Sequence, residues 1–433
     1  MQPVLPLVEK LFPYAYSIVA SGNDEAVSAY LEELPFDVLE YASGSEMNGW
    51  LIPEAHVVER ATIRKDGTLI YDGTCSPLGV IAQSQSFTGP LALEELLLHL
   101  HVDPMNPAAV PYHWRQLYGR GPVDWGFCLP SSLRDDLVEG VYDIDLSTRF
   151  VPGTMKVFVT TLPGQSDRTV LLNAHNCHPY QANDDISGVA VGIRAMHAIA
   201  EIPNRRLTYA LMIAPELLGP MFWLADESAE KTPIIGALLL KSVGNDSTLR
   251  MQESFSGNSA MDAAGHAVML KRFGMFNGGP FRTVYGNDEI VFEAPGAEIP
   301  TIEFTRSPFA EYHSDADRPE KLNEAALQET LNVILDVVRH LENDKFYCRT
   351  SNGIPCLSNP KFDLYFPVTD RRLGSDESRE LRRRWNLLMN CLPRYLDGHI
   401  SVAQIARHHR LPTDEVTAYI ERWVEKGLAE LIY

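Results

Sequence analysis

The chain has 433 residues, of which 45% are hydrophobic, and a formal net charge of -20. A chain of this length buries large cores and divides into two or three domains, while its acidity disfavours nucleic acids and anionic membranes as partners. Its six cysteines form no CxxC pair and are too sparse for a disulfide scaffold, which favours a reducing compartment. No stretch reaches the roughly 18 apolar residues of a membrane-spanning helix, so we expect a cytoplasmic protein.

Residues 1–44 predict two helices. Apolar residues recur at helical spacing over 4–20 and again over 24–42. Asn23 or Asp24 would cap the second helix through its side chain. We assign both helices to the main domain of the chain.

The hydrophobic period changes at about residue 45. Residues 50–73 read as a strand, an Asp66-Gly67 turn and a second strand, which is the signature of a β-hairpin. Residues 91–101 read as a short helix. We interpret residues 45–124 as a small β-rich domain inserted into the main domain.

Apolar strands and helical runs alternate between residues 125 and 345. Such alternation is typical of an α/β domain whose sheet is mostly parallel and buried. We expect strands at 155–162, 169–175, 207–214, 234–243 and 299–305, and helices at 188–202, 220–229 and 325–344. Residues 1–44 and 125–345 are thus expected to form one core, a central sheet flanked by helices.

The last part of the chain has a different character. Residues 346–365, rich in Pro, Asn and Ser, are typical of a linker. Residues 366–433 then contain a helix, a helix-turn-helix with Pro412-Thr413 before its second helix, and Gly427 ahead of a short apolar strand. This order predicts a winged-helix domain.

The strand at 169–175 ends in a dense group of metal-binding residue types, His175, Cys177, His178, Asp184 and Asp185. Functional groups collect just past the carboxyl ends of strands in open α/β sheets. Zinc binds imidazole nitrogen and carboxylate oxygen, so the pattern predicts a metal site. A polar loop that caps the next helix through Asp185 or Ser187 is the alternative.

Two later strands also lead to candidate site residues. The strand at 207–214 runs into Glu216, a lone carboxylate that suits a ligand or a proton carrier. A solvated strand end is the alternative. The strand at 299–305 leads to His313, and acids that follow could orient its second ring nitrogen.

Together these segments resemble the zinc aminopeptidase-like family, whose core runs from a strand-borne His through an Asn-Asp pair to a strand-borne Glu and a final Tyr-His. A bacterial subgroup, named polysaccharide biosynthesis proteins with an aminopeptidase-like domain, is similar over nearly the whole chain, inserted β-rich module and winged helix included. The motifs that carry the likeness are HLH at 99–101, VPY at 110–112, WGFCL at 125–129, CHP at 177–179, ANDD at 182–185, PELLG at 215–219 and YHSDAD at 312–317.

The resemblance implies a zinc site and a general base. It makes His178, Asp184 and His313 the metal ligands, with His175 as the rival for the first position. It places Glu216 where the family holds its general-base glutamate. The resemblance further implies that this zinc site hydrolyses an amide bond.

The sequence departs from the family where further metal-binding acids are expected. Leu217 follows Glu216 in place of a second glutamate, and Lys241 stands where another acid is expected, with Asp246 beyond it. These departures favour one zinc ion per chain over a pair.

The expected substrate is a small peptide or an amino-acyl amide, in a biosynthetic pathway for a polysaccharide or a secondary metabolite. Arg282, Arg306 and Lys241 are candidates to pair with a substrate carboxylate, because a buried cation needs an anion. Ordinary ion pairing within an acidic chain is the alternative. The inserted module would set substrate preference if it overhangs the cleft, and a homo-oligomer is compatible with the sequence.

Two other functions compete with hydrolysis. A binding protein with a decayed peptidase core is favoured by Leu217 and opposed by Glu216. A DNA-binding regulator is suggested by the winged helix, but its second helix presents a poor phosphate-facing surface, because it carries Asp414, Glu415, Glu421 and Glu425. We expect that domain to serve packing or oligomer formation.

Overall fold

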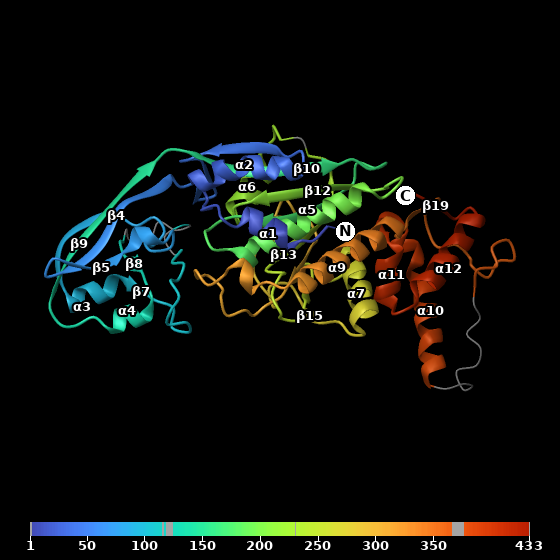
Figure 1. The fold of residues 1–433 in the computed structure, drawn as a ribbon. Helices are drawn as coiled ribbons and strands as arrows, with labels where there is room; N and C mark the ends of the chain where they lie inside the picture. Colours follow the sequence, from blue (N-terminus) through green and yellow to red (C-terminus); the bar gives the residue numbers. More distant parts are fainter. Residues whose placement is uncertain (1, 115–116, 118–123, 230, 366–375, 433) are drawn as a thin grey trace.

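The computed structural model describes residues 2–114, 117, 124–229, 231–365 and 376–432. Figure 1 shows a β-rich module at one end, a large α/β core in the middle and a mainly helical module at the other end. Among the described residues, no helix is long and apolar enough to cross a lipid bilayer. All six cysteines are free thiols.

The core is built on an eight-stranded sheet. Its strands lie in the order β1 (Asp37–Ala42), β10 (Thr154–Leu162), β12 (Thr208–Ala214), β11 (Thr169–His175), β13 (Ile234–Lys241), β16 (Thr301–Thr305), β14 (Arg250–Gln252) and β15 (Gly278–Gly279). The four central strands, β12 to β16 in this order, are parallel, whereas β1–β10, β10–β12 and β14–β16 are antiparallel pairs. The sheet is therefore mixed, with a parallel centre.

Side chains alternate between the two faces of this sheet, as the two-residue period of a strand requires. In β11, Val170 and Leu172 join one buried cluster and Leu171 joins the other. The first face is covered by α1 (Leu5–Leu11), α2 (Ser21–Glu33), α5 (Ser187–Ala200), α7 (Ala260–Phe273) and α9 (Glu324–Asn343), and the second by α6 (Leu218–Ala225) and α8 (Glu289–Phe292). The predicted core strands and helices are present to within a few residues.

The prediction for the amino-terminal region was wrong in three places, the first being that the helix expected over 4–20 ends at Leu11. Residues 37–42 form β1 and not the end of a helix, and α2 begins at Ser21, ahead of the expected cap at Asn23. Antiparallel pairing of β1 with β10 explains why residues 37–42 form a strand. Such pairing with a distant strand overrides a local helical period, because strand stability comes from cross-strand packing.

The β-rich module contains a four-stranded antiparallel sheet in the order β5 (Thr68–Asp72), β4 (Ala55–Lys65), β9 (Val141–Val151) and β6 (Phe87–Ala92). The predicted hairpin is confirmed, and both turn residues have positive φ, 48° at Asp66 and 77° at Gly67. The helix expected at 91–101 is reduced to α3 (Leu93–Leu96), and α4 (Ser131–Asp135) follows later. Because β9 lies beyond residue 124, we propose that the module ends near residue 151.

The last module combines helices with a three-stranded sheet. Its elements are β17 (Phe346–Arg349), α10 (Asp376–Tyr395), β18 (Asp397–Ser401), α11 (Val402–His409), α12 (Thr413–Glu425) and β19 (Ala429–Leu431). Strand β17 thus falls within the expected linker, while residues 366–375 lie outside the described residues. The winged-helix assignment stays a prediction. Arg407 of α11 pairs with Glu253 of the core at 2.8 Å, so α11 packs against the core.

Candidate metal centre

The candidate site lies at the edge of the sheet where the parallel strands end. Strand β11 ends at His175, β12 ends shortly before Glu216, and β13 ends at Lys241. The loop after β16 carries His313. Because these strands are parallel neighbours, their carboxyl ends meet at one edge, which is where open α/β sheets place functional groups.

Three of the predicted ligands meet at this edge. The ligand atoms of His178, Asp184 and His313 all lie within 4.8 Å of one another. Asp184 Oδ2 lies 3.6 Å from His178 Nε2 and 3.4 Å from His313 Nε2. Two atoms bound to one tetrahedral zinc ion are ~3.4 Å apart at the usual bond lengths. The donor types and their spacing therefore fit a zinc ion.

Two atoms of this cluster are buried without a hydrogen-bond partner, His178 Nε2 and Asp184 Oδ2. His178 Nδ1 lies 2.9 Å from the main-chain oxygen of Pro179, to which it can donate. That bond leaves the lone pair of Nε2 directed towards Asp184. Buried polar atoms are nearly always partnered, and a cation between these two would satisfy both.

The loop that carries Asp184 is held by hydrogen bonds to its main chain. The carboxylate of Asp317 accepts from the main-chain N–H groups of Asn183 and Asp184, at 2.8 and 3.0 Å. Asn183 Oδ1 accepts from the main-chain N–H of Gly244 at 2.9 Å. These bonds fix the position of the Asp184 carboxylate, as outer partners do for ligands in metal sites.

The other oxygen of Asp184 faces Lys241 and His175. Lys241 Nζ donates to Asp184 Oδ1 and, at 2.8 Å, to His175 Nε2. His175 Nε2 lies 3.1 Å from Asp184 Oδ1. His175, the rival for the first ligand position, therefore lies on the Lys241 side of Asp184, and His178 lies on the side of His313.

The charges of Asp184 and Lys241 stabilise each other. Burial would raise the pKa of Asp184, but the Lys241 ammonium and the hydrogen bonds from His175, His178 and His313 together hold this pKa well below its usual range. Burial would lower the pKa of Lys241, but the nearby negative groups, Asp184 first and then Glu216, together keep it well above its usual range. Burial and the charge of Lys241 both lower the pKa of His175, which favours a neutral ring.

Glu216 stands on a sharp turn between β12 and α6. The main-chain N–H of Leu218 donates to Glu216 O at 2.7 Å, and Leu217 has a φ of 62°. Asp288 Oδ1 accepts from the main-chain N–H of Leu217 at 2.6 Å and anchors the turn. Glu216 is half-buried. A second group of ligand-type atoms, all within 4.8 Å of one another, belongs to Glu216, His175 and Cys177.

One segment of the β-rich module covers the cluster of candidate ligands. The ring of Tyr112 stacks on that of His178, with centroids 4.6 Å apart, and contacts His313 edge-on. The main-chain N–H of Tyr112 donates to His313 O at 2.7 Å. The main-chain N–H of Val110 donates to the Asp315 carboxylate at 2.9 Å. The module thus fixes the loop that carries His313.

Of the three cations considered for substrate binding, only Lys241 reaches the cluster. Arg282 pairs with Glu289 at 2.9 Å. Arg306 is buried and pairs with Glu329 of α9. Arg306 therefore links β16 to the helix layer, and it takes no part in the site proposed below.

The sequence patterns missed two buried acids near the site. Asp288 and Glu303 are fully buried, and each has one oxygen without a hydrogen-bond partner. Burial raises the pKa of both carboxyls well above the usual range. Glu303 interrupts an apolar strand, a signal similar to the one that identified Glu216. Tyr112 belongs to the VPY motif at 110–112, but the motif gave it no role, because that role depends on how the module docks.

The fold and this cluster define the class of protein, an α/β protein with the aminopeptidase-like fold. A zinc aminopeptidase from Bacillus subtilis superposes with a TM-score of 0.57 and 14% identity, over 78% of this chain and 94% of that chain. The crystal structure of a "putative peptidase" from Clostridium acetobutylicum superposes with a TM-score of 0.74 and 23% identity, over 99% of this chain and 96% of that chain.

The chain belongs to the family described as a domain of unknown function (DUF4910), whose model matches residues 5–344. A Clostridium acetobutylicum protein named "Putative polysaccharide biosynthesis protein with aminopeptidase-like domain" is 26% identical over 344 residues, 79% of this chain and 78% of that protein. The resemblance deduced from the motifs is thereby confirmed. The match to the family model ends before the last module.

Proposed function

We propose that the chain is a zinc-dependent amidohydrolase with one zinc ion held by His178, Asp184 and His313. The observation that carries this proposal is the pair of buried atoms without hydrogen-bond partners, His178 Nε2 and Asp184 Oδ2, at the separation of two ligands. The aminopeptidase-like fold supports it, because a zinc aminopeptidase shares that fold.

A bound zinc ion would supply a Lewis acid that polarises a carbonyl group and acidifies water. Glu216 would take a proton from the attacking water and pass it to the leaving amine. The amide C–N bond breaks, the water oxygen joins the carbonyl carbon, and the nitrogen gains the proton. The products are a carboxylic acid and an amine.

Two aromatic side chains adjoin the cluster and suit a small peptide or amino-acyl amide. Tyr312 is 41% exposed and stacks on His313, with centroids 3.8 Å apart. Trp114 is 42% exposed and contacts His313 edge-on. Flat, partly exposed rings of this kind pack on apolar groups of a ligand. The name of the Clostridium relative supports a substrate from a biosynthetic pathway.

A binding protein with a decayed peptidase core is the second candidate. Leu217 follows Glu216 where a second glutamate is expected, and Lys241 occupies the place of another acid. Such a protein would hold the ion and a ligand without cleaving an amide. Metal content alone does not separate the two candidates, so turnover must be measured.

The test is metal analysis of the full chain, purified without chelators, followed by a screen of aminoacyl and acyl-amino-acid amides. We expect the wild-type chain to hold zinc and to hydrolyse at least one amide. Glu216→Gln should keep zinc and lose about 10²–10⁴-fold in rate, whereas His178→Ala should lose zinc. Glu227→Gln, at an exposed position beyond the far end of α6, is the matched control and should change neither.

Three outcomes would contradict parts of this proposal. Full activity in Glu216→Gln would remove the glutamate from the chemistry. Zinc bound without hydrolysis of any amide would favour the binding protein. A wild-type chain that binds no zinc would overturn the metal site.

A further inference from the structure

The two oxygens of Asp184 face two different pairs of side chains. Oδ2 faces His178 and His313, at 3.6 and 3.4 Å, and Oδ1 faces His175 and Lys241. A carboxylate with an imidazole nitrogen at ligand distance on each side has the arrangement of a bridge between two cations. On the Oδ1 side, the position of the cation is taken by an ammonium group.

The Oδ1 side has metal-binding chemistry of its own. His175 Nε2 and Asp184 Oδ1 are 3.1 Å apart, close to the separation of two atoms that bind one ion. Both accept hydrogen bonds from Lys241 Nζ. His175 also belongs, with Cys177 and Glu216, to the second group of ligand-type atoms. Without the ammonium, these groups could form a cation site.

We propose that the Lys241 ammonium fills the second cation position of a carboxylate-bridged pair, so that the chain holds one metal ion and one fixed positive charge. This inference rests on the proposed function, because it takes the His178 side of Asp184 as the metal position. Lys241 is 2% exposed. Removal of the Lys241 ammonium would leave the Asp184 carboxylate as an unpaired buried charge, which is destabilising.

A built-in ammonium differs from a metal ion in what it can do. It carries one positive charge and donates hydrogen bonds, but it has no open coordination position for a water or a carbonyl oxygen. It holds the Asp184 carboxylate in place before any metal arrives. The remaining position is therefore preorganised for a single ion, and metal loading should be one binding event.

The test counts metal ions bound to the full chain. Metal-free protein is titrated with Zn²⁺ by calorimetry, and bound metal is measured after gel filtration. We expect one ion in the wild-type chain and two in Lys241→Asp, which removes the ammonium and adds a carboxylate. Lys241→Asp combined with His175→Ala should return to one ion. Lys271→Asp, the same change at an exposed position of α7, is the matched control and should hold one.

Two results would overturn the inference: two ions in the wild-type chain, or one ion in folded Lys241→Asp. No ion in the wild-type chain would instead overturn the zinc site itself, so the two failures are distinguishable. Thermal unfolding shows whether Lys241→Asp is folded. If it is not, Lys241→Ser opens the same position without adding charge, and a second, weaker ion is expected there. A folded Lys241→Ser that holds one ion would equally overturn the inference.

Discussion

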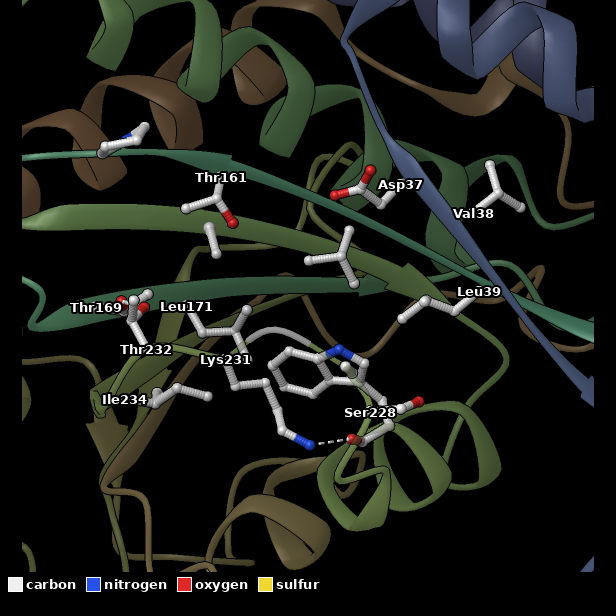
Figure 2. Close-up of a pocket in the computed structure, with 15 residues that line it drawn as sticks. Asp37, Val38, Leu39, Thr161, Thr169, Leu171, Ser228, Lys231, Thr232 and Ile234 are labelled. Carbon is white, nitrogen blue, oxygen red and sulfur yellow. Dashed lines mark hydrogen bonds between the residues drawn. The ribbon is translucent and has the colours of Figure 1, made fainter.

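Two lysines mark the two ends of strand β13 and have different partners. Lys231 precedes the strand and lines a cavity of about 880 Å³ beside the first residues of β1, β11 and β13 (Figure 2). Its ammonium donates to the main-chain oxygens of Trp223, Leu224 and Asp226 at the end of α6. Lys241 closes the strand and donates to a carboxylate and an imidazole.

The pKa values of the two lysines are shifted in opposite directions. Burial lowers the pKa of Lys231 by more than the nearby Asp226 raises it. At Lys241 the charges of Asp184 and Glu216, with smaller contributions from neighbouring tyrosines, together outweigh burial, and the pKa rises. Carbonyl groups at a helix end favour a cation through their partial charges, whereas a buried carboxylate requires one. The partner, and not burial, therefore distinguishes a helix cap from a site residue.

The largest effect should come from Lys241→Met in protein stripped of metal. This change leaves the Asp184 carboxylate buried without a cation, and we expect it to lower the free energy of unfolding by about 3–5 kcal/mol. Urea denaturation in the presence of a chelator measures the loss. A loss below about 1 kcal/mol would show that the contrast between the two lysines has no energetic basis.

Zinc binding on the His178 side of Asp184 should also distinguish the two ends of the strand. Zinc at about a hundredfold excess over its Kd should raise the free energy of unfolding by about 2.7 kcal/mol. Lys231→Met should retain this gain, because Lys231 lies away from the ligands, and His178→Ala should lose it. Thermal unfolding with and without zinc provides the measurement. An equal gain in His178→Ala would place the ion elsewhere.

Glu303 tests how much negative charge Lys241 compensates. Burial, and then the charge of Glu289, raise the pKa of Glu303 above its ordinary value of 4.5. A carboxyl with a raised folded-state pKa contributes stability below its unfolded pKa and loses it as pH rises towards the folded value. Glu303→Gln does not titrate.

We therefore expect Glu303→Gln to be neutral at about pH 4 and to stabilise the chain by about 1 kcal/mol at about pH 8. Thermal unfolding at both pH values measures the difference. A stabilisation that is equal at the two pH values would contradict the raised pKa. If Glu303→Gln were less stable than the wild-type chain at about pH 8, Glu303 would be held as a carboxylate.

Lys231→Met should have the smallest effect. It removes the hydrogen bonds to the last carbonyl groups of α6 but leaves no buried charge unpaired, so we expect a loss of about 0.5 kcal/mol in the free energy of unfolding. Zinc content should stay unchanged. A loss as large as that of Lys241→Met would erase the distinction between the two ends of the strand.

The core of the fold was predictable because its strands and helices have clear apolar patterns in the local sequence. An apolar run such as 169–175 ends abruptly in ligand-type residues, and the structure has a strand over that range. Residues 37–42 misled the prediction because their apolar spacing suits a helix as well as a strand. Only their pairing with β10, formed by residues far along the chain, selects the strand.

The candidate site was predictable as a set of residue types but not as an arrangement. The sequence could not choose between His175 and His178, because both follow β11 within a few residues. In three dimensions His178 turns towards His313 and His175 turns towards Lys241. The role of Tyr112 required the docking of a distant module, which no local pattern encodes.

The bond between Tyr112 and His313 O has a practical consequence for anyone who wishes to shorten this protein. A fragment lacking the β-rich module would keep the residues of the sheet, His178 and Asp184, but the loop that carries His313 would lose its hydrogen bond from Tyr112 and the edge-on contact with that ring. Trimming at the module boundary would therefore remove contacts that hold one of the proposed ligands. If the module were exchanged for that of a relative, the residues at 110–112 would have to form the same hydrogen bonds to the loop that carries His313.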